Sequence, residues 1–147
     1  MADYIVKWHG KKVFTTITKV NVKAMIKSAQ LVERYTKKHF TLQGDYRPYK
    51  KGKKIHWSSE PGKPPAIDMG ILRASIMSEV TESAGQVIGK VGPDGEYIAT
   101  RVPVGTDVDY GLYLELGTSK MEPRPFLRPA LLKNQVKIEK IFREANK

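Results

Sequence analysis

A stretch rich in proline and glycine divides this chain and limits where helices and strands can form. Four prolines and four glycines lie between residues 44 and 70 of the 147-residue sequence. Proline fixes φ and lacks an N–H, and glycine loses the most conformational entropy when ordered, so neither suits the interior of a regular element. We therefore expect a long, flexible basic loop over residues 44–66, with regular elements on either side of it.

The first residues of the chain predict a short β-hairpin. Tyr4, Val6 and Trp8 alternate with their neighbours, as in a half-buried strand. His9-Gly10 is the expected turn, and Val13–Thr18 is the expected second strand.

A long helix is expected between this hairpin and the loop. Asn21 is the candidate N-cap, and the helix should end before Gly44. Apolar residues recur at helical spacing, at Val22, Met25, Ala29, Val32 and Tyr35 or Thr36.

Beyond the loop, a short helix and a turn are predicted. Asp68 is a candidate cap for a helix that continues through Leu72 and Ile76. Pro93-Asp94-Gly95 predicts a turn, because proline presets φ and glycine accepts a positive φ.

Strands are predicted on both sides of this turn. Val87, Gly89 and Val91 alternate with their neighbours. A half-buried antiparallel strand is expected from the same alternation at Val102, Val104 and Val108.

Two more helices are predicted near the end of the chain. Tyr110–Leu116 is a short apolar run that Gly117 should stop, and a longer helix should span Phe126–Asn146. One face of the longer helix would carry Leu127, Leu131, Asn134, Ile138, Ile141 and Phe142. The fold class is therefore α+β, in one domain over residues 1–147. We expect an antiparallel sheet of about four strands, packed against the long N-terminal helix and the C-terminal helix.

The positive charge of the chain is confined to its first part. Residues 1–63 hold 15 Lys/Arg and 4 Asp/Glu, a net charge of +11, whereas residues 64–147 hold 11 of each. Such an uneven distribution suggests an acidic or polyanionic partner, and a solvated face that aids solubility is the equally simple alternative.

The sequence offers little for catalysis or metal binding. It has no cysteine, which excludes disulfides and thiolate zinc sites, and its three histidines lie far apart. Asp107 and Asp109 could share one side of a strand, but two carboxylates are too few for a cation site. Gly117-Thr118-Ser119-Lys120 has the wrong order for a phosphate-binding loop. We expect no enzyme activity, no metal and no cofactor. No secretory signal or membrane-spanning segment is expected either.

Nucleic-acid binding is the main alternative that the residues themselves suggest. Aromatic side chains that can stack on bases interleave with cations that can meet phosphates. The candidate partner-binding residues are Arg47, Lys50, Lys51, Lys53, Lys54 and Trp57.

Two segments resemble a known family. The first reads Pro61-Gly62-Lys63-Pro64-Pro65 and then Asp68-Met69-Gly70-Ile71-Leu72-Arg73-Ala74-Ser75. The second reads Tyr110-Gly111-Leu112-Tyr113-Leu114-Glu115-Leu116-Gly117-Thr118 and continues as Arg124-Pro125-Phe126-Leu127-Arg128-Pro129-Ala130. In this order and at this spacing, they resemble the head–tail joining or tail-completion (neck) proteins of long-tailed bacteriophages and prophages. Gly111 and Leu116 depart from the pattern, which has alanine and an aromatic residue there.

The resemblance implies a structural protein of the virion, assembled in the bacterial cytoplasm. It implies a ring of identical subunits, most simply sixfold, that contacts other neck and tail proteins such as the connector, the tail terminator or the tail tube. The motif residues that it singles out are Asp68, Gly70, Leu72, Arg73, Tyr110, Glu115, Gly117, Thr118, Arg124, Pro125, Phe126, Arg128 and Pro129.

The two motif arginines and Glu115 have open roles at this point. Arg124 and Arg128 could hold carboxylates within the fold or on a neighbouring subunit, and Glu115 is a candidate partner. A nucleic-acid-binding module and a nuclease remain the alternative functions, the nuclease resting only on Asp107 and Asp109.

Overall fold

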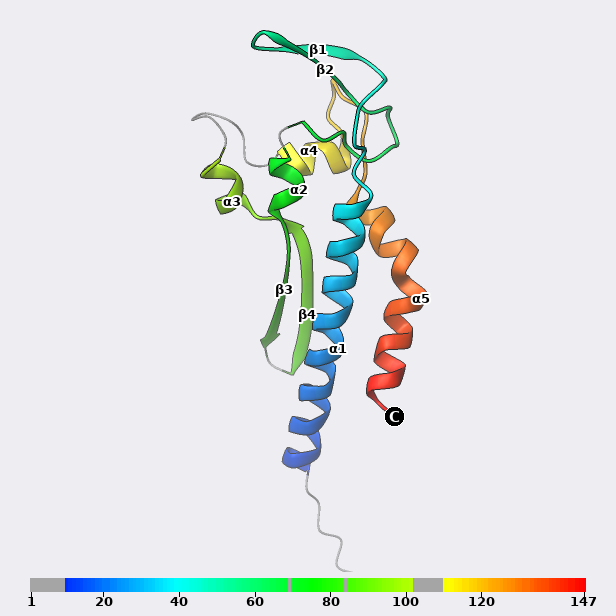
Figure 1. Cartoon of the computed structure of the whole chain (residues 1–147). Helices are drawn as coiled ribbons and strands as arrows, with labels where there is room; N and C mark the ends of the chain where they lie inside the picture. Colours follow the sequence, from blue (N-terminus) through cyan, green and yellow to red (C-terminus); the bar gives the residue numbers. More distant parts are fainter. Residues whose placement is uncertain (1–9, 69, 84, 102–109) are drawn as a thin grey trace, which may run out of the picture.

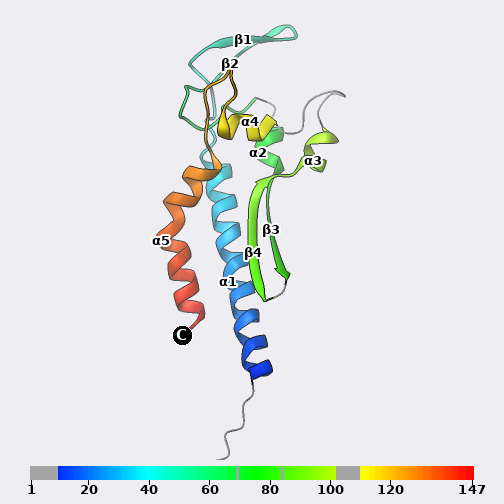
Figure 2. The same cartoon turned by 180° about the vertical axis from the view of Figure 1, so that it is seen from behind.

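One long helix, α1 (Gly10–Lys38), is the central element of the molecule. The computed structural model describes residues 10–68, 70–83, 85–101 and 110–147, with side chains from Thr18 onward. A hairpin of β3 (Ile76–Ser83) and β4 (Gln86–Pro93) packs on one side of α1, and α5 (Leu127–Ala145) packs on another. The view from behind shows the same order, with α1 between the hairpin and α5 (Figures 1 and 2).

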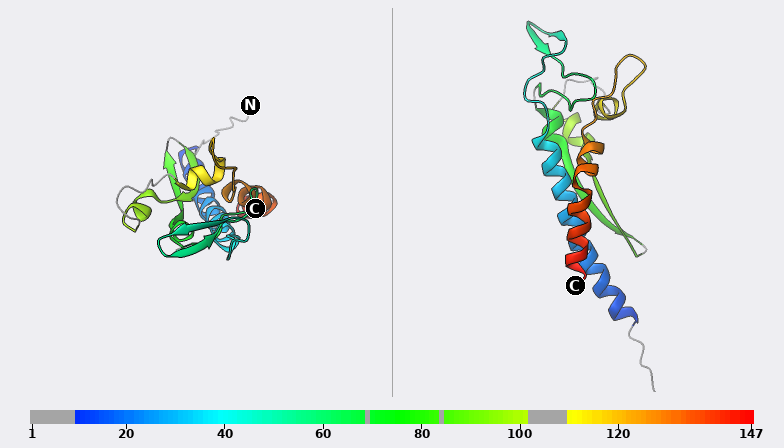
Figure 3. Two further views of the ribbon diagram at one scale, coloured as in Figure 1. Left: turned by 90° about the horizontal axis from the view of Figure 1, so that it is seen from above. Right: turned by 90° about the vertical axis from the view of Figure 1, so that its right-hand side faces the viewer.

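The remaining elements gather at one end of this body. They are β1 (Pro48–Lys51), β2 (Lys54–Trp57), α2 (Ile71–Ser75), α3 (Gly95–Ala99) and α4 (Tyr110–Leu116). Strands β1 and β2 form a separate antiparallel hairpin, which projects beyond α2 and α4 (Figure 3).

The class is α+β, as the sequence predicts, but the sheet arrangement is different. Among the described residues there are two separate two-stranded antiparallel sheets, β1–β2 and β3–β4, and no four-stranded sheet. The expected strand over Val102–Val108 lies outside the described residues.

The prediction for the start of the chain was wrong where it can be checked. Helix α1 already runs from Gly10 through Val13–Thr18, so Asn21 lies inside a helix and caps nothing. The spacing of Val13, Ile17, Val20 and Ala24 is itself helical, and extending an existing helix costs little compared with starting one. The expected strand residues Tyr4, Val6 and Trp8 lie outside the described residues. The predicted end before Gly44 is confirmed.

Strand β3 was missed, and the turn at Pro93-Asp94-Gly95 was misassigned. β3 pairs with β4 in the register from Ile76 opposite Pro93 to Ser83 opposite Gln86. Asp94 is the N-cap of α3, because its carboxylate accepts the backbone N–H of Tyr97 at 3.0 Å. A side-chain acceptor at this position satisfies an N–H that the helix leaves free.

Asp68 does not cap α2. The N-cap is Gly70, with φ of 76° and no side-chain cap, and the chain turns into β3 at Ile76 instead of continuing as helix. The carboxylate of Asp68 is instead used by the β1–β2 hairpin, as described below.

The hydrophobic core lies beneath this end of the body. Phe40, Leu72, Ile76 and Phe126 form its buried centre, and the rings of Phe40 and Phe126 lie 5.4 Å apart. Partly buried side chains complete it, at Ile67, Val91, Tyr110, Leu114 and Leu127. Residues from both family-like segments therefore share one core.

Candidate functional site

The two family-like segments meet in a set of contacts that we call the motif joint. It comprises residues 59–62, helix α4 with Gly117, and residues 123–128. Its central group is the carboxylate of Glu115. One oxygen, Oε2, accepts the N–H groups of Phe126 at 2.8 Å and Leu127 at 3.0 Å. The other, Oε1, accepts the N–H of Arg128 at 2.9 Å.

This arrangement caps α5 from a different helix. The first N–H groups of an α-helix have no partner within the helix, and the partial positive charge there favours an anion. The nominal N-cap, Phe126, has no side-chain acceptor. Glu115 therefore does for α5 what a neighbouring Ser or Asp usually does, and it ties α4 to α5.

Glu115, the candidate partner of the motif arginines, forms no ion pair with Arg124 or Arg128 in the described part of the chain. Arg124 donates from Nε to the backbone oxygen of Ser59 at 3.0 Å and forms no ion pair there. The exposed side chain of Arg128 lines the groove described below and forms no ion pair with a described residue. The carboxylate prefers three backbone donors that are already aligned at a helix end.

Backbone hydrogen bonds close the joint on its other side. Arg124 donates its N–H to the oxygen of Leu114 at 2.6 Å, and Gly62 donates to the oxygen of Pro123 at 2.9 Å. The Pro-Gly loop of the first segment is thus attached to the proline-rich stretch of the second. Ser59, which the sequence did not single out, is buried beside this contact.

Glycines allow the close approaches in the joint. Gly117 ends α4 with φ of 76°, as predicted, and an added Cβ would lie 2.9 Å from the oxygen of Met121. A Cβ on buried Gly111 would lie 2.8 Å from Cγ of Pro93 and 3.1 Å from Cδ1 of Leu72. The departure from alanine at 111 therefore fits the local packing of this chain.

The other motif residues have supporting positions. Thr118 Oγ1 accepts the N–H of Lys120 at 3.2 Å in the turn after α4. Pro129 lies in the first turn of α5, where a missing N–H costs little. Pro125 is half-buried, and Arg73 is exposed without an ion pair to any described residue.

The β1–β2 hairpin holds five of the six predicted partner-binding residues, and the sixth, Arg47, directly precedes β1. The two strands of the hairpin lie where the sequence predicts a long basic loop. Pro48 opens β1, and Gly52 supplies a positive φ of 61° in the connection between the strands. The same residues that suggested a loop therefore serve as the ends of a hairpin. Its base is fixed by hydrogen bonds from Tyr46 N–H to the oxygen of Ser58 and from Ser58 N–H to the oxygen of Arg47.

Asp68 connects this hairpin to the body. Its carboxylate pairs with the ammonium of Lys51 and with Nδ1 of His56, the latter at 3.0 Å. Burial, and secondly the charge of Asp68, raises the pKa of both Tyr49 in the hairpin and Tyr110 in α4. Asp68 thus lies between the hairpin and the motif joint.

An apolar groove of about 610 Å³ runs between α1, β4 and α5. α1 contributes Met25, Ala29 and Val32, and α5 contributes Leu131 and Phe142. Gly89 leaves β4 without a side chain beside Met25. The groove exposes apolar surface of the kind that a partner normally covers.

No family model, curated protein or solved structure matches this chain. Within the described ranges there is no group of three or more His, Asp or Glu that could hold a metal ion. In the same part of the chain, no helix is long and apolar enough to cross a membrane. Asp107 and Asp109 lie outside the described residues.

Proposed function

We propose that this chain is a structural subunit of a long-tailed bacteriophage neck, where it joins the tail to the head or completes the tail. Identical copies would pack side by side in a ring around the tail axis, with sixfold symmetry as the resemblance implies. The subunit would contact other neck and tail proteins, and it would carry out no covalent chemistry.

The observation that carries this proposal is the distribution of apolar side chains. Among the described residues, nine hydrophobic side chains are buried, and three of these are alanines. Fourteen large hydrophobic side chains are exposed. Scattered apolar residues are normal on a monomer, but a continuous apolar surface such as the groove between α1, β4 and α5 usually marks an interface. A subunit that completes its core by packing against neighbours accounts for this imbalance.

The motif joint also supports the proposal that copies of the subunit pack side by side. Hydrogen bonds and core packing in the joint fix the orientation of α5 relative to α4. The residues that make these contacts are Glu115, Gly117, Arg124 and Phe126. Helix α5 also forms one wall of the apolar groove. The residues that carry the family resemblance would therefore set the shape of the surface available to a neighbouring subunit.

The proposal can be tested with two substitutions one residue apart on α5. Leu131 lines the apolar groove and is 54% exposed, whereas Leu132 is 59% exposed and does not line it. The gene for this chain would be deleted from the phage, and the bacterial host would supply each variant from a plasmid. Leu131→Glu should reduce the yield of infectious particles at least tenfold, and Leu132→Glu should reduce it much less.

Both variants should melt at the wild-type temperature, because both side chains are exposed. Equal yields from Leu131→Glu and wild type would show that the groove is not a contact surface between subunits. Normal infectious yield without any copy of the chain would contradict the neck function itself.

A further inference from the structure

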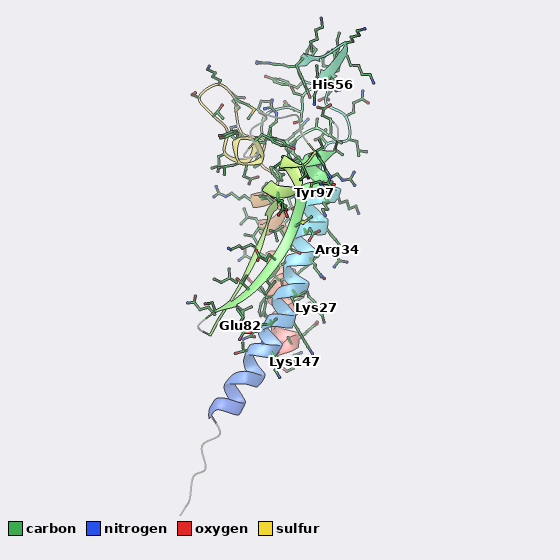
Figure 4. All side chains as sticks on the ribbon, turned by 90° about the vertical axis from the view of Figure 1, so that its left-hand side faces the viewer. Lys27, Arg34, His56, Glu82, Tyr97 and Lys147 are labelled. Atoms are coloured by element: carbon green, nitrogen blue, oxygen red, sulfur yellow. The ribbon has the colours of Figure 1, made fainter. Side chains whose placement is uncertain are left out.

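The β1–β2 hairpin carries a dense positive charge. Residues 46–57 contain five Lys/Arg and no Asp/Glu. Every residue of both strands is exposed except His56, which is half-buried. Figure 4 places His56 at the end of the molecule opposite to Glu82, so the hairpin is far from the acidic end of β3.

Cross-strand pairing sorts the side chains of the hairpin onto two faces. Residues directly opposite each other share a face of an antiparallel pair. Tyr49 lies opposite His56 and Lys51 opposite Lys54, which defines an inner face because Lys51 and His56 meet Asp68. The outer face carries Pro48 and Lys50, opposite Trp57 and Ile55.

Three of the hairpin lysines have no charge partner within the described part of the chain. Lys50, Lys53 and Lys54 form no ion pair with any described residue, whereas Lys51 is already neutralised by Asp68. Lys50 lies on the outer face, Lys53 lies in the connection between the strands, and Lys54 lies on the inner face. Unpaired cations therefore surround the tip of the ribbon instead of lining one side of it.

Aromatic and apolar side chains accompany these cations. Trp57 is 45% exposed and Ile55 is 70% exposed on the outer face. Tyr49 stacks on His56 with ring centroids 5.7 Å apart, and the guanidinium of Arg47 lies over the ring of Tyr46. Side chains of this kind can contact deoxyriboses and base edges in a groove, beside the phosphates that the cations meet.

We propose that the β1–β2 hairpin binds the sugar-phosphate backbone of double-stranded DNA. A two-stranded ribbon fits the major groove, which is about 12 Å wide. Phosphates flank that groove on both sides, and the unpaired lysines lie on both faces and at the tip of the ribbon. An acidic protein surface would attract the same charges, but it does not present the regular rows of phosphates that line both sides of a DNA groove. This proposal does not depend on the neck function, because the binding is a property of the free protein.

The test is fluorescence anisotropy of a labelled 20-base-pair duplex titrated with the purified full chain. Wild type should bind at 0.1 M salt with an affinity that falls steeply as the salt concentration rises. K50Q/K53Q/K54Q should bind roughly 10- to 100-fold more weakly at that salt. Its log–log salt slope should be shallower by about 2 to 3, since each phosphate contact contributes about 0.9.

A matched control removes the same charge from α5. Lys133, Lys137 and Arg143 are exposed and form no ion pair with a described residue. K133Q/K137Q/R143Q should bind within about threefold of wild type, and both triple variants should melt at the wild-type temperature. Equal weakening by the two triple variants would show diffuse attraction and overturn the proposal.

Two further outcomes would also overturn it. One is no binding of the duplex by wild type at 0.1 M salt. The other is lysine-dependent binding of poly-glutamate as tight as that of DNA at equal charge, which would assign the hairpin to an acidic protein surface.

Discussion

The motif joint and the β1–β2 hairpin lie next to each other but are held in different ways. In the joint, one carboxylate accepts three backbone N–H groups, and Phe126 is buried in the core beside it. The hairpin is attached through its base and through Asp68, and nearly all of its side chains are exposed. The comparison separates residues that fix the shape of the subunit from residues that are free to meet a partner.

The largest expected effect on stability comes from removing the buried phenyl ring of the motif joint. Phe126→Ala should lower the free energy of unfolding by about 3 to 5 kcal/mol, because it deletes a buried ring that packs on Phe40. Urea denaturation measures this. Leu112→Ala, an exposed position on α4, should change the value by less than about 0.5 kcal/mol. Similar losses in the two variants would contradict the placement of the core.

The next effect comes from the cap on α5. Glu115→Ala should cost about 2 to 4 kcal/mol, because three N–H groups lose a charged acceptor. Glu115→Gln keeps one acceptor oxygen and should cost about half as much. The exposed Glu122 is the control, and Glu122→Ala should be nearly neutral. If Glu115→Ala were also neutral, the carboxylate would not be what orients α5.

A moderate, pH-dependent effect is expected where α1 meets β3. Glu33 accepts hydrogen bonds from Lys37 at 2.8 Å and from Ser78 at 2.6 Å. Partial burial alone would raise the pKa of Glu33, but these two hydrogen bonds and the Lys37 charge outweigh it and hold the pKa below its ordinary value of 4.5.

The sign of the effect follows from this lowered pKa. The stabilisation is present above pH 4.5 and is lost as the pH falls through the folded pKa. The unfolding free energies of wild type and Glu33→Gln, measured from pH 7 to pH 3, should therefore converge on the acid side. A constant gap across that range would rule out ionised Glu33 as the source.

The smallest effect on stability is expected at the link between hairpin and body. Asp68→Asn should cost less than about 1 kcal/mol, because ion pairs near the surface contribute little. Hydrogen exchange should nevertheless speed up in residues 48–57 and stay unchanged in residues 115–128. A global loss above about 2 kcal/mol would mean that the hairpin belongs to the folded core.

The predictable parts of the fold are those that depend on local patterns. The short helix ended by Gly117, the long C-terminal helix and the strand around Val91 follow from periodicity and from glycine chemistry. The start of α1 and the hairpin at Gly52 were missed because β-branched residues and glycine each suit more than one local structure.

The site was predictable as a set of residues but not as a set of contacts. Glu115 and Arg124 were both singled out, yet sequence alone could not show that the carboxylate takes three backbone N–H groups. Ser59 and Gly62 gave no signal beyond their place in a proline-rich stretch. Contacts between residues 11 to 65 positions apart depend on tertiary packing, which a local pattern does not encode.

The most direct test of the proposed function is electron microscopy of particles made by the phage when the gene for this chain is deleted. The account predicts filled or empty heads and complete tails that fail to join properly, with joining restored by the wild-type chain. Normally joined, infectious particles made without the chain would contradict it.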